Sequence, residues 1–187
     1  MKSSKKINKS SIKIIAGKYK GKILHMDILP HTRPTKSILR ESLFNTLQDS
    51  IKDKILIEVF AGYGSVGFEA FSRGAKKVIF IERDSLSFSI LCENINLFDT
   101  QNLVAYNEDS LVFLERFCKK NHFDILYLDP PFCLDYDEIF LLLSKIDLSN
   151  KMIIIEHISS FAMPRKIKHL DLEKSKRFGR STLSYYF

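Results

Sequence analysis

The chain has 187 residues, of which 45% are hydrophobic and 27% are charged, and its formal net charge is +7. This length and balance suit one globular domain with a full core, and no apolar run approaches the roughly 20 residues that a transmembrane helix needs. A Lys- and Ser-rich start argues against a secretion signal, and three cysteines without metal-ligand spacing predict a cytoplasmic protein that binds no metal.

The first predicted element is a β-hairpin. Apolar runs at residues 12–15 and 23–26 flank a turn between Gly17 and Gly21. Pro30 and Pro34 then mark a linker. From about residue 35 to about residue 50 the apolar positions recur at helical spacing, which predicts an amphipathic helix.

Beyond that helix, strands and helices alternate. Short apolar runs predict strands at residues 55–60, 77–82, 102–106, 123–129 and 152–156. Helical spacing predicts helices at residues 66–72, 85–98, 110–118 and 136–145. This alternation indicates an α/β fold with a doubly wound, mostly parallel sheet. The last two apolar runs, at residues 167–173 and 182–187, have no helix between them, so we expect an antiparallel hairpin at one sheet edge.

The positive charge is concentrated near the N-terminus. Residues 1–40 contain eleven Lys or Arg and one acid, Asp27, which makes this segment +10, whereas the rest of the chain is −3. A basic arm on a slightly acidic body indicates a polyanionic partner such as nucleic acid. A tail that only aids solubility would explain residues 1–10 equally well. It explains less well why Lys18, Lys20 and Lys22 crowd one turn around Tyr19.

A glycine motif follows the first strand of the alternating part. Gly62, Gly64 and Gly67 form the pattern G-x-G-x-x-G between a predicted strand and a predicted helix. Glycines at such a turn let the backbone bend sharply and approach a ligand closely. The motif alone is weak, because NAD-binding folds share it.

Three acids help to distinguish the possible cofactors. Glu58 lies in the strand before the glycines, Glu82 ends the next strand, and Asp109 follows the third. A pyrophosphate gains nothing from the charge of Glu58, while Glu82 is well placed for a ribose diol and Asp109 for an adenine amine. Acids around a glycine loop suit S-adenosylmethionine, which has a sulfonium and an ammonium group; NAD is the alternative. The candidate cofactor-binding residues are Glu58, Phe60, Ala61, Gly62, Gly64, Gly67, Glu82, Arg83, Asp109 and Ser110.

The candidate catalytic motif is Asp129-Pro130-Pro131-Phe132, which ends an apolar strand. The prolines stop the strand and leave a carboxylate, a backbone carbonyl and a ring at its carboxyl end, where open α/β sheets bind ligands. The Asp129 carboxylate and the Pro130 carbonyl can accept both hydrogens of a flat amino group, while Phe132 stacks on the base that carries it. The motif therefore indicates methylation of an exocyclic nucleobase amine, although a plain strand-ending turn explains an isolated Asp-Pro-Pro equally well.

Further segments point to one family. In chain order they are Arg33-Pro34-Thr35, Arg40-Glu41-Ser42-Leu43-Phe44-Asn45, Phe60-Ala61-Gly62-Tyr63-Gly64 and Asp129-Pro130-Pro131-Phe132. Their order and spacing resemble the RsmD family of bacterial ribosomal RNA guanine-N2 methyltransferases, over residues 12–187. The resemblance implies a class I S-adenosylmethionine-dependent methyltransferase fold, Rossmann-like, with a seven-stranded, mostly parallel sheet and an N-terminal hairpin that contacts RNA. It also implies S-adenosylmethionine as methyl donor and, as substrate, one guanine of 16S rRNA in the small ribosomal subunit, conventionally numbered 966.

With this resemblance the chain divides into a basic disordered tail (1–11), an RNA-binding hairpin and linker (12–34) and a methyltransferase domain (35–187). We expect a monomer. The candidate RNA-binding residues are Lys18, Tyr19, Lys20, Lys22, Arg33 and Arg40. The lysines and Arg33 would contact phosphates, Tyr19 would stack on a base or brace the hairpin, and Arg40 would face phosphate or the methionine carboxylate.

Two residues depart from the family pattern. Glu58 stands where Asp is usual, and Tyr63 stands where a small residue is usual, so its ring is expected to alter cofactor affinity. Two other functions stay open at this stage. One is an N6-adenine methyltransferase acting on RNA or DNA, because the adenine amine fits the same acceptors. The other is a noncatalytic RNA-binding protein on a methyltransferase scaffold.

Overall fold

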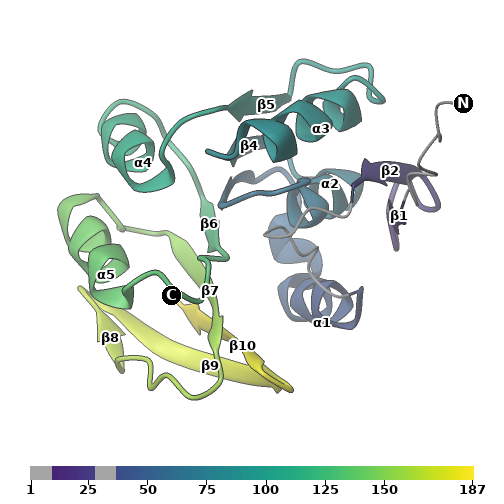
Figure 1. Ribbon diagram of the computed structural model, residues 1–187. Helices are drawn as coiled ribbons and strands as arrows, with labels where there is room; N and C mark the ends of the chain where they lie inside the picture. Colours follow the sequence, from purple (N-terminus) through teal and green to yellow (C-terminus); the bar gives the residue numbers. More distant parts are fainter. Residues whose placement is uncertain (1–9, 28–36) are drawn as a thin grey trace, which may run out of the picture.

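The computed structural model describes residues 10–27 and 37–187 (Figure 1). Arg33 and most of the expected N-terminal tail therefore lie outside the described residues. The described part forms an eight-stranded sheet with helices on both faces and a separate two-stranded hairpin. None of the helices within it has the length and apolar character that crossing a membrane requires.

The sheet has the strand order β5-β4-β3-β6-β7-β10-β9-β8. Five strands are parallel: β3 (Ile55–Val59), β4 (Lys77–Ile81), β5 (Leu103–Tyr106), β6 (Ile125–Leu128) and β7 (Met152–Ile158). Three antiparallel strands extend the β7 edge: β10 (Ser181–Tyr186), β9 (Leu170–Phe178) and β8 (Lys166–Ile167). The resemblance implied seven strands; the additional one is β8, whose two residues pair with the start of β9.

Helices cover the sheet in two layers. On one face lie α1 (Ser37–Leu47) with the short 3-10 turn Gln48–Ile51, α2 (Ser65–Ser72) and α3 (Ser85–Ile95); on the other lie α4 (Ser110–Cys118) and α5 (Tyr136–Lys145). Neighbouring strand residues face opposite layers, so Leu56 joins the first core and Ile57 the second. Because both faces are covered, the parallel strands are near-continuous apolar runs, which is why the sequence predicted them.

The N-terminal hairpin belongs to the first helical layer. It pairs β1 (Ser10–Lys13) with β2 (Ile23–Met26), and Ser10 and Ser11, which were expected in the tail, are part of β1. Ile12 and Leu24 face each other across the hairpin and are buried in the same core as α1, α2 and α3. The hairpin is therefore packed onto the domain through its apolar side.

The C-terminal hairpin is longer than predicted. β9 runs from Leu170 to Phe178, whereas the apolar pattern ended at residue 173. Beyond that residue most β9 side chains are exposed, so no apolar periodicity could signal a strand there. Backbone pairing with β10, from Lys174 opposite Tyr185 to Phe178 opposite Ser181, extends the strand instead.

Candidate active site

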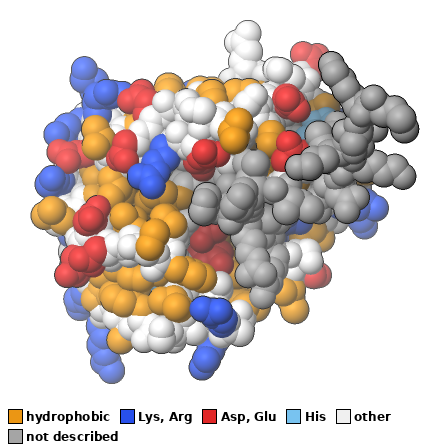
Figure 2. Space-filling model, viewed as in Figure 1, with side chains coloured by type: hydrophobic (Ala, Val, Ile, Leu, Met, Phe, Trp, Pro, Cys, Tyr) orange, Lys and Arg blue, Asp and Glu red, His pale blue; other side chains and the backbone are white. Residues whose placement is uncertain are grey.

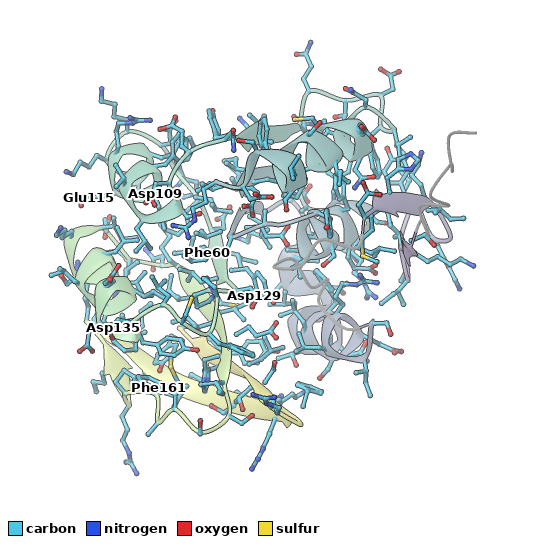
Figure 3. All side chains as sticks on the ribbon, in the orientation of Figure 1. Phe60, Asp109, Glu115, Asp129, Asp135 and Phe161 are labelled. Atoms are coloured by element: carbon cyan, nitrogen blue, oxygen red, sulfur yellow. The ribbon has the colours of Figure 1, made fainter. Side chains whose placement is uncertain are left out.

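The candidate site lies where the winding of the sheet reverses. From β3 the chain continues to β4 and β5 on one side, and it then crosses to β6 and β7 on the other. A ligand crevice forms at the carboxyl ends of the two strands that flank such a switch point. The glycine loop leaves β3 there and the Asp129 turn leaves β6, with the Asp129 amide donating to the Val59 carbonyl at 3.4 Å. The fold thus brings the predicted cofactor loop and catalytic motif together (Figure 3).

The glycine loop needs bare backbone at Gly64 and Gly67. Gly64 has φ +78, and a Cβ on it would lie 2.7 Å from side-chain atoms of Leu91 and Phe68. A Cβ on Gly67 would lie 2.7 Å from Oε2 of Glu58. Side chains at these positions would push the loop away from α3 and from β3. The glycines therefore let the loop and the first turn of α2 pack closely against the strand ends.

The backbone turns sharply at the end of β3. Phe60 has φ +60, a left-handed conformation that is uncommon for a bulky residue and is often found at ligand sites. The next amide, that of Ala61, donates to the Ile81 carbonyl at 3.0 Å, which fastens the loop to the end of β4. The half-buried Phe60 ring thus lies at the switch point between the two motifs.

Glu58 lies beneath the glycine loop and not in the crevice. Its two carboxylate oxygens accept hydrogen bonds from the amides of Val66 (3.2 Å) and Gly67 (2.7 Å), in the first turn of α2. The side chain is buried, which raises the pKa of Glu58 to about 8, although the two amides and the Arg40 charge oppose the shift. Since both oxygens are directed at the helix, Glu58 shapes the loop. This corrects the expectation that it contacts the cofactor.

Glu82 lies at the crevice between two chain segments. One oxygen accepts from the Gly62 amide and the other from the Asp84 amide, both at 2.7 Å. Its backbone carbonyl is held by Asn107 Nδ2 at 2.8 Å. Each carboxylate oxygen retains acceptor capacity for a ligand hydroxyl. Sequence reasoning missed Asn107, although it follows the predicted strand 102–106 at the same sheet edge.

Two of the remaining predicted cofactor residues, Asp109 and Ser110, lie at the start of α4, and Arg83 follows β4. The Asp109 carboxylate caps this helix by accepting from the amides of Leu111 (3.1 Å) and Val112 (3.2 Å), and it lies 3.8 Å from the guanidinium of Arg83. Asp109 and Arg83 are both exposed, whereas Ser110 is buried and, among the described residues, its hydroxyl has no hydrogen-bond partner. Asp109 thus has a structural role as a helix cap, and its contact with an adenine amine stays a prediction.

The catalytic turn exposes a ring and partly buries an acid. Phe132 is 51% exposed, Pro130 is buried and Asp129 is half-buried. Burial raises the pKa of Asp129 well above its ordinary value, and the negative charges of Glu156 and Glu58 raise it further. Asp129 therefore holds a proton more tightly than an exposed aspartate does.

Sequence reasoning missed Glu156 and Tyr127, which lie beside this turn. Leu128 of β6 pairs with Ile155 of β7, so Glu156 is next to Asp129 at the sheet edge. Glu156 is 7% exposed and accepts a 2.9 Å hydrogen bond from the Tyr127 hydroxyl. The available signal was positional, since Glu156 ends the predicted strand 152–156 just as Asp129 ends 123–129.

Two of the candidate RNA-binding lysines are exposed, although the ammonium of Lys18 lies 5.2 Å from the centre of the Tyr19 ring, and the third is bound to the protein. Lys18 and Lys20 are exposed on the hairpin turn. The ammonium of Lys22 donates to the Leu97 carbonyl at 2.7 Å and lies 4.9 Å from the centre of the Phe98 ring. Lys22 therefore fastens the hairpin to the end of α3, and its expected role as a phosphate contact stays a prediction.

Tyr19 and Arg40 are also engaged inside the protein. The Tyr19 ring packs against Phe71 and Phe98, with centroids 5.8 and 4.9 Å away, so of its two expected roles it has the bracing one. Arg40 is 3% exposed and its Nη2 donates to the Lys13 carbonyl at 3.0 Å. Its guanidinium thereby joins α1 to β1. Arg40 also borders the groove between β1 and the start of α1, and its expected contact with phosphate or the cofactor stays a prediction.

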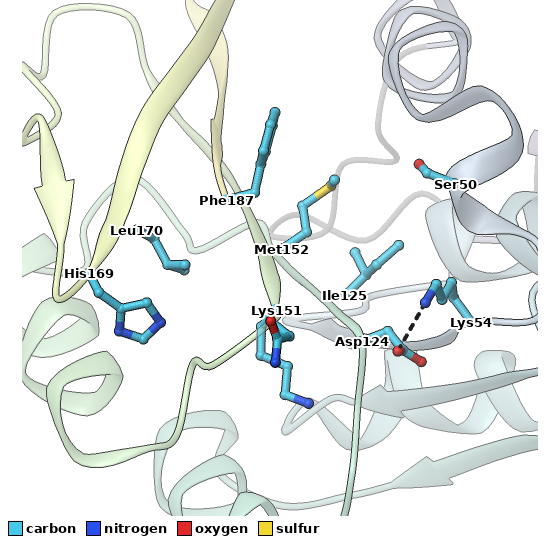
Figure 4. A pocket seen from close by; sticks show the side chains of 10 residues that line it. Ser50, Lys54, Asp124, Ile125, Lys151, Met152, His169, Leu170 and Phe187 are labelled. Atoms are coloured by element: carbon cyan, nitrogen blue, oxygen red, sulfur yellow. Dashed lines mark hydrogen bonds and ion pairs between the residues drawn. The ribbon is translucent and has the colours of Figure 1, made fainter.

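A separate cavity of about 400 Å³ lies at the opposite edge of the sheet (Figure 4). It adjoins Ile125 and Met152, at the amino-terminal ends of β6 and β7, and an ion pair of 3.4 Å joins Lys54 to Asp124 on its wall. Because ligands of open α/β sheets bind at the carboxyl ends of the strands, this cavity is not part of the candidate active site.

Comparisons with known proteins bear on the family and the fold of this chain. The model of the family described as conserved hypothetical protein 95 matches residues 12–187. The chain is 32% identical to ribosomal RNA small subunit methyltransferase D of Haemophilus influenzae, over 90% of this chain and 82% of that protein. A solved structure of a candidate methyltransferase from Escherichia coli is 30% identical to this chain, with a TM-score of 0.81. The match covers 95% of this chain and 97% of the solved chain. A solved structure of a candidate methyltransferase complexed with S-adenosylhomocysteine has a TM-score of 0.73 and 11% identity. The match covers 100% of this chain and 58% of the solved chain, and it shows a shared fold alone.

Proposed function

This chain belongs to the RsmD family, described as conserved hypothetical protein 95, and we propose that it methylates the N2 amine of one guanine in 16S rRNA, conventionally numbered 966. The methyl donor is S-adenosylmethionine, and the guanine is presented by the small ribosomal subunit. The relative from Haemophilus influenzae, named as a small subunit rRNA methyltransferase, supports the substrate class. The observation that carries the proposal is the Asp129-Pro130-Pro131-Phe132 turn at the switch point, beside a glycine loop.

The turn supplies what amine methylation needs. The guanine amine is a poor nucleophile because its lone pair is delocalised into the ring. The Asp129 carboxylate and the Pro130 carbonyl accept its two N–H groups, direct the lone pair at the methyl group and stabilise the positive charge that develops on nitrogen. Phe132, with its exposed ring, stacks on a base that has swung out of its neighbours.

Residues at the carboxyl ends of β3 and β4 support the proposed cofactor. The Glu82 carboxylate keeps acceptor capacity for the two ribose hydroxyls, and the amides that bind it hold it at the edge of the glycine loop. Gly64 lets the loop pack closely on Leu91 and Phe68, which fixes its position at the end of β3. The cofactor supplies a sulfonium-bound methyl group that is already a strong electrophile, so the protein needs to provide alignment and acceptors, without a metal or a strong base.

Asp129 is also the proposed acceptor of the surplus proton. Methylation leaves the amine nitrogen with one proton too many, and the Asp129 carboxylate already accepts a hydrogen bond from one of its N–H groups. The raised pKa of Asp129 makes it a better base than an ordinary aspartate. The proton can then leave to solvent when the product departs.

The basic hairpin is the proposed RNA contact. Lys18 and Lys20 are exposed on its turn, and a groove of about 1070 Å³ between β1 and the start of α1 has Lys13 and Lys20 on its walls. These ammonium groups position the RNA backbone without reading its sequence.

On the face shown in Figure 2, hydrophobic side chains gather on the α5 side and Lys and Arg lie mainly at the periphery. We expect the enzyme to act as a monomer in the cytoplasm.

Labelled methyl donor and unmethylated small subunits test the proposal. The protein should transfer label to 16S rRNA, and nucleoside digestion should yield N2-methylguanosine. Labelled N6-methyladenosine would favour the adenine methyltransferase, because the adenine amine fits the same two acceptors. Absence of labelled RNA, with S-adenosylmethionine bound in a calorimetric titration, would indicate a noncatalytic RNA-binding protein.

A further inference from the structure

Tyr63 joins the cofactor loop to the N-terminal β-hairpin of β1 and β2. Its ring does not enter the cofactor crevice, because the side chain is 2% exposed and packs in the core that includes the hairpin residue Leu24. Its hydroxyl donates to the carbonyl oxygen of Asp27, one residue beyond the end of β2, at 2.6 Å. The ring that the sequence places in the glycine loop thus binds the return strand of the hairpin.

Asn94 of α3 makes a second connection between the same two segments. This side chain is fully buried; its Oδ1 accepts from the His25 amide at 2.7 Å and its Nδ2 donates to the His25 carbonyl at 3.0 Å. The same Nδ2 lies 3.4 Å from the carbonyl oxygen of Tyr63. One amide group therefore holds both the backbone of β2 and the backbone of the cofactor loop.

The other end of the hairpin is fixed just as firmly. The buried carboxylate of Glu69, on α2, accepts from the amides of Ile15 (2.7 Å) and Ala16 (3.0 Å), and Ser72 Oγ accepts from the Tyr19 amide at 2.9 Å. With α2 holding the turn side and Tyr63 holding the return strand, the hairpin has no hinge within the described residues. Its position relative to the glycine loop is thereby set.

We propose that Tyr63 is a positioning residue, which fixes the N-terminal β-hairpin relative to the cofactor loop. RNA that is bound by this β-hairpin then places its target amine in line with the methyl group of the donor. This inference rests on the proposed function. Gly62 and Gly64, on either side of Tyr63, form the glycine turn, so loss of the Tyr63 hydroxyl bond to Asp27 would shift the hairpin end relative to a cofactor seat that stays in place. Methyl transfer depends steeply on alignment, and a misplacement of about 1 Å can cost about 10²-fold in rate.

Tyr63→Phe tests this inference, because it removes the hydroxyl and keeps the ring. Tyr186→Phe is the matched control, because Tyr186 is also fully buried and its hydroxyl also donates to a backbone carbonyl, that of Pro164, at 2.8 Å. Tyr186 belongs to β10 and not to the N-terminal β-hairpin. Two quantities are measured for each variant. One is the single-turnover rate of methyl transfer to unmethylated small subunits with enzyme and donor saturating, and the other is the calorimetric Kd for S-adenosylhomocysteine.

We expect Tyr63→Phe to lower the single-turnover rate about tenfold while its S-adenosylhomocysteine Kd stays within about twofold of the wild-type value. Tyr186→Phe should change neither quantity. A wild-type rate in Tyr63→Phe, or a rate loss matched by weaker cofactor binding, would overturn the positioning role and leave the proposed function intact. A wild-type enzyme that methylates no small subunits would overturn the proposed function and this inference with it.

Discussion

Replacing Asp129 by Asn tests the catalytic turn with little change of shape. Asn offers one neutral acceptor oxygen in place of a carboxylate, so the charge that stabilises the developing cation is lost while the Pro130 carbonyl remains. Removing one preorganised electrostatic group from an active site costs about 2.7–4 kcal/mol, which slows the step by roughly 10²–10³-fold. Burial, and after it the charges of Glu156 and Glu58, raise the pKa of Asp129, so its ionised form is disfavoured in the folded protein. The neutral variant should therefore be at least as stable as the wild type.

The assay is single-turnover transfer of labelled methyl to unmethylated small subunits, with calorimetry for cofactor binding and thermal unfolding for stability. Cofactor affinity should be nearly unchanged, because the glycine loop and Glu82 belong to β3 and β4 and not to β6. Asp137→Asn, at an exposed acid in the first turn of α5, is the matched control and should keep the wild-type rate. A rate within threefold of wild type in Asp129→Asn would refute the proposed role of this carboxylate.

Three further predictions concern pH, hairpin docking and RNA contact. Methylation needs ionised Asp129, so the rate should fall as the pH drops through the pKa of Asp129, which burial raises above the value of roughly 3.9 that is ordinary for an aspartate. In a pH–rate profile, Glu156→Gln should move this loss of rate to lower pH, because it removes a negative charge that raises the pKa of Asp129. Glu69→Ala leaves two hairpin amides without their acceptor and should lower the free energy of unfolding by about 3–5 kcal/mol in denaturant titrations. The double substitution of Lys18 and Lys20 by Ala should reduce the slope of log Kd for RNA against log salt by roughly 1.5.

Each of these predictions has a contrasting outcome. A pH–rate profile that Glu156→Gln leaves unchanged would mean that Glu156 does not act on Asp129. A loss below about 1 kcal/mol in Glu69→Ala would mean that the hairpin amides find other partners. Lys22→Ala is the control for the lysine pair: its ammonium is bound to the Leu97 carbonyl, so it should lower stability and keep the salt slope. An equal change of slope in Lys22→Ala would contradict its docking role.

The sequence predicted the elements well where the signal is local. The runs at residues 55–60 and 123–129 are apolar on both faces, and each ends at residues that cannot continue a strand, so both strands were recognised within a residue or two. The order of these elements then brings the glycine loop and Asp129 to one sheet edge, because parallel strands share their carboxyl ends. The prediction failed for the second half of β9, where the side chains face solvent and only pairing with β10 makes the strand.

Side chains were harder to assign than elements. Glu58, Lys22 and Arg40 were predicted to face ligands, yet each binds backbone groups of another element. Their partners are 9, 75 and 27 residues away in sequence. A charged residue type indicates that a partner exists, but only the packed structure determines whether that partner is a ligand or the protein itself.

By itself, the sequence determined the α/β class, the succession of strands and helices along the chain, the family and the positions of the glycine loop and the Asp129 turn. Periodicity and turn chemistry act between near neighbours, so these features can be read without the fold. Only the tertiary structure decided that Glu156 adjoins Asp129, that Glu58 supports the loop from below, and that Tyr63 binds the hairpin. These contacts join segments that the chain brings together only when the sheet and its two helical layers close around a common core.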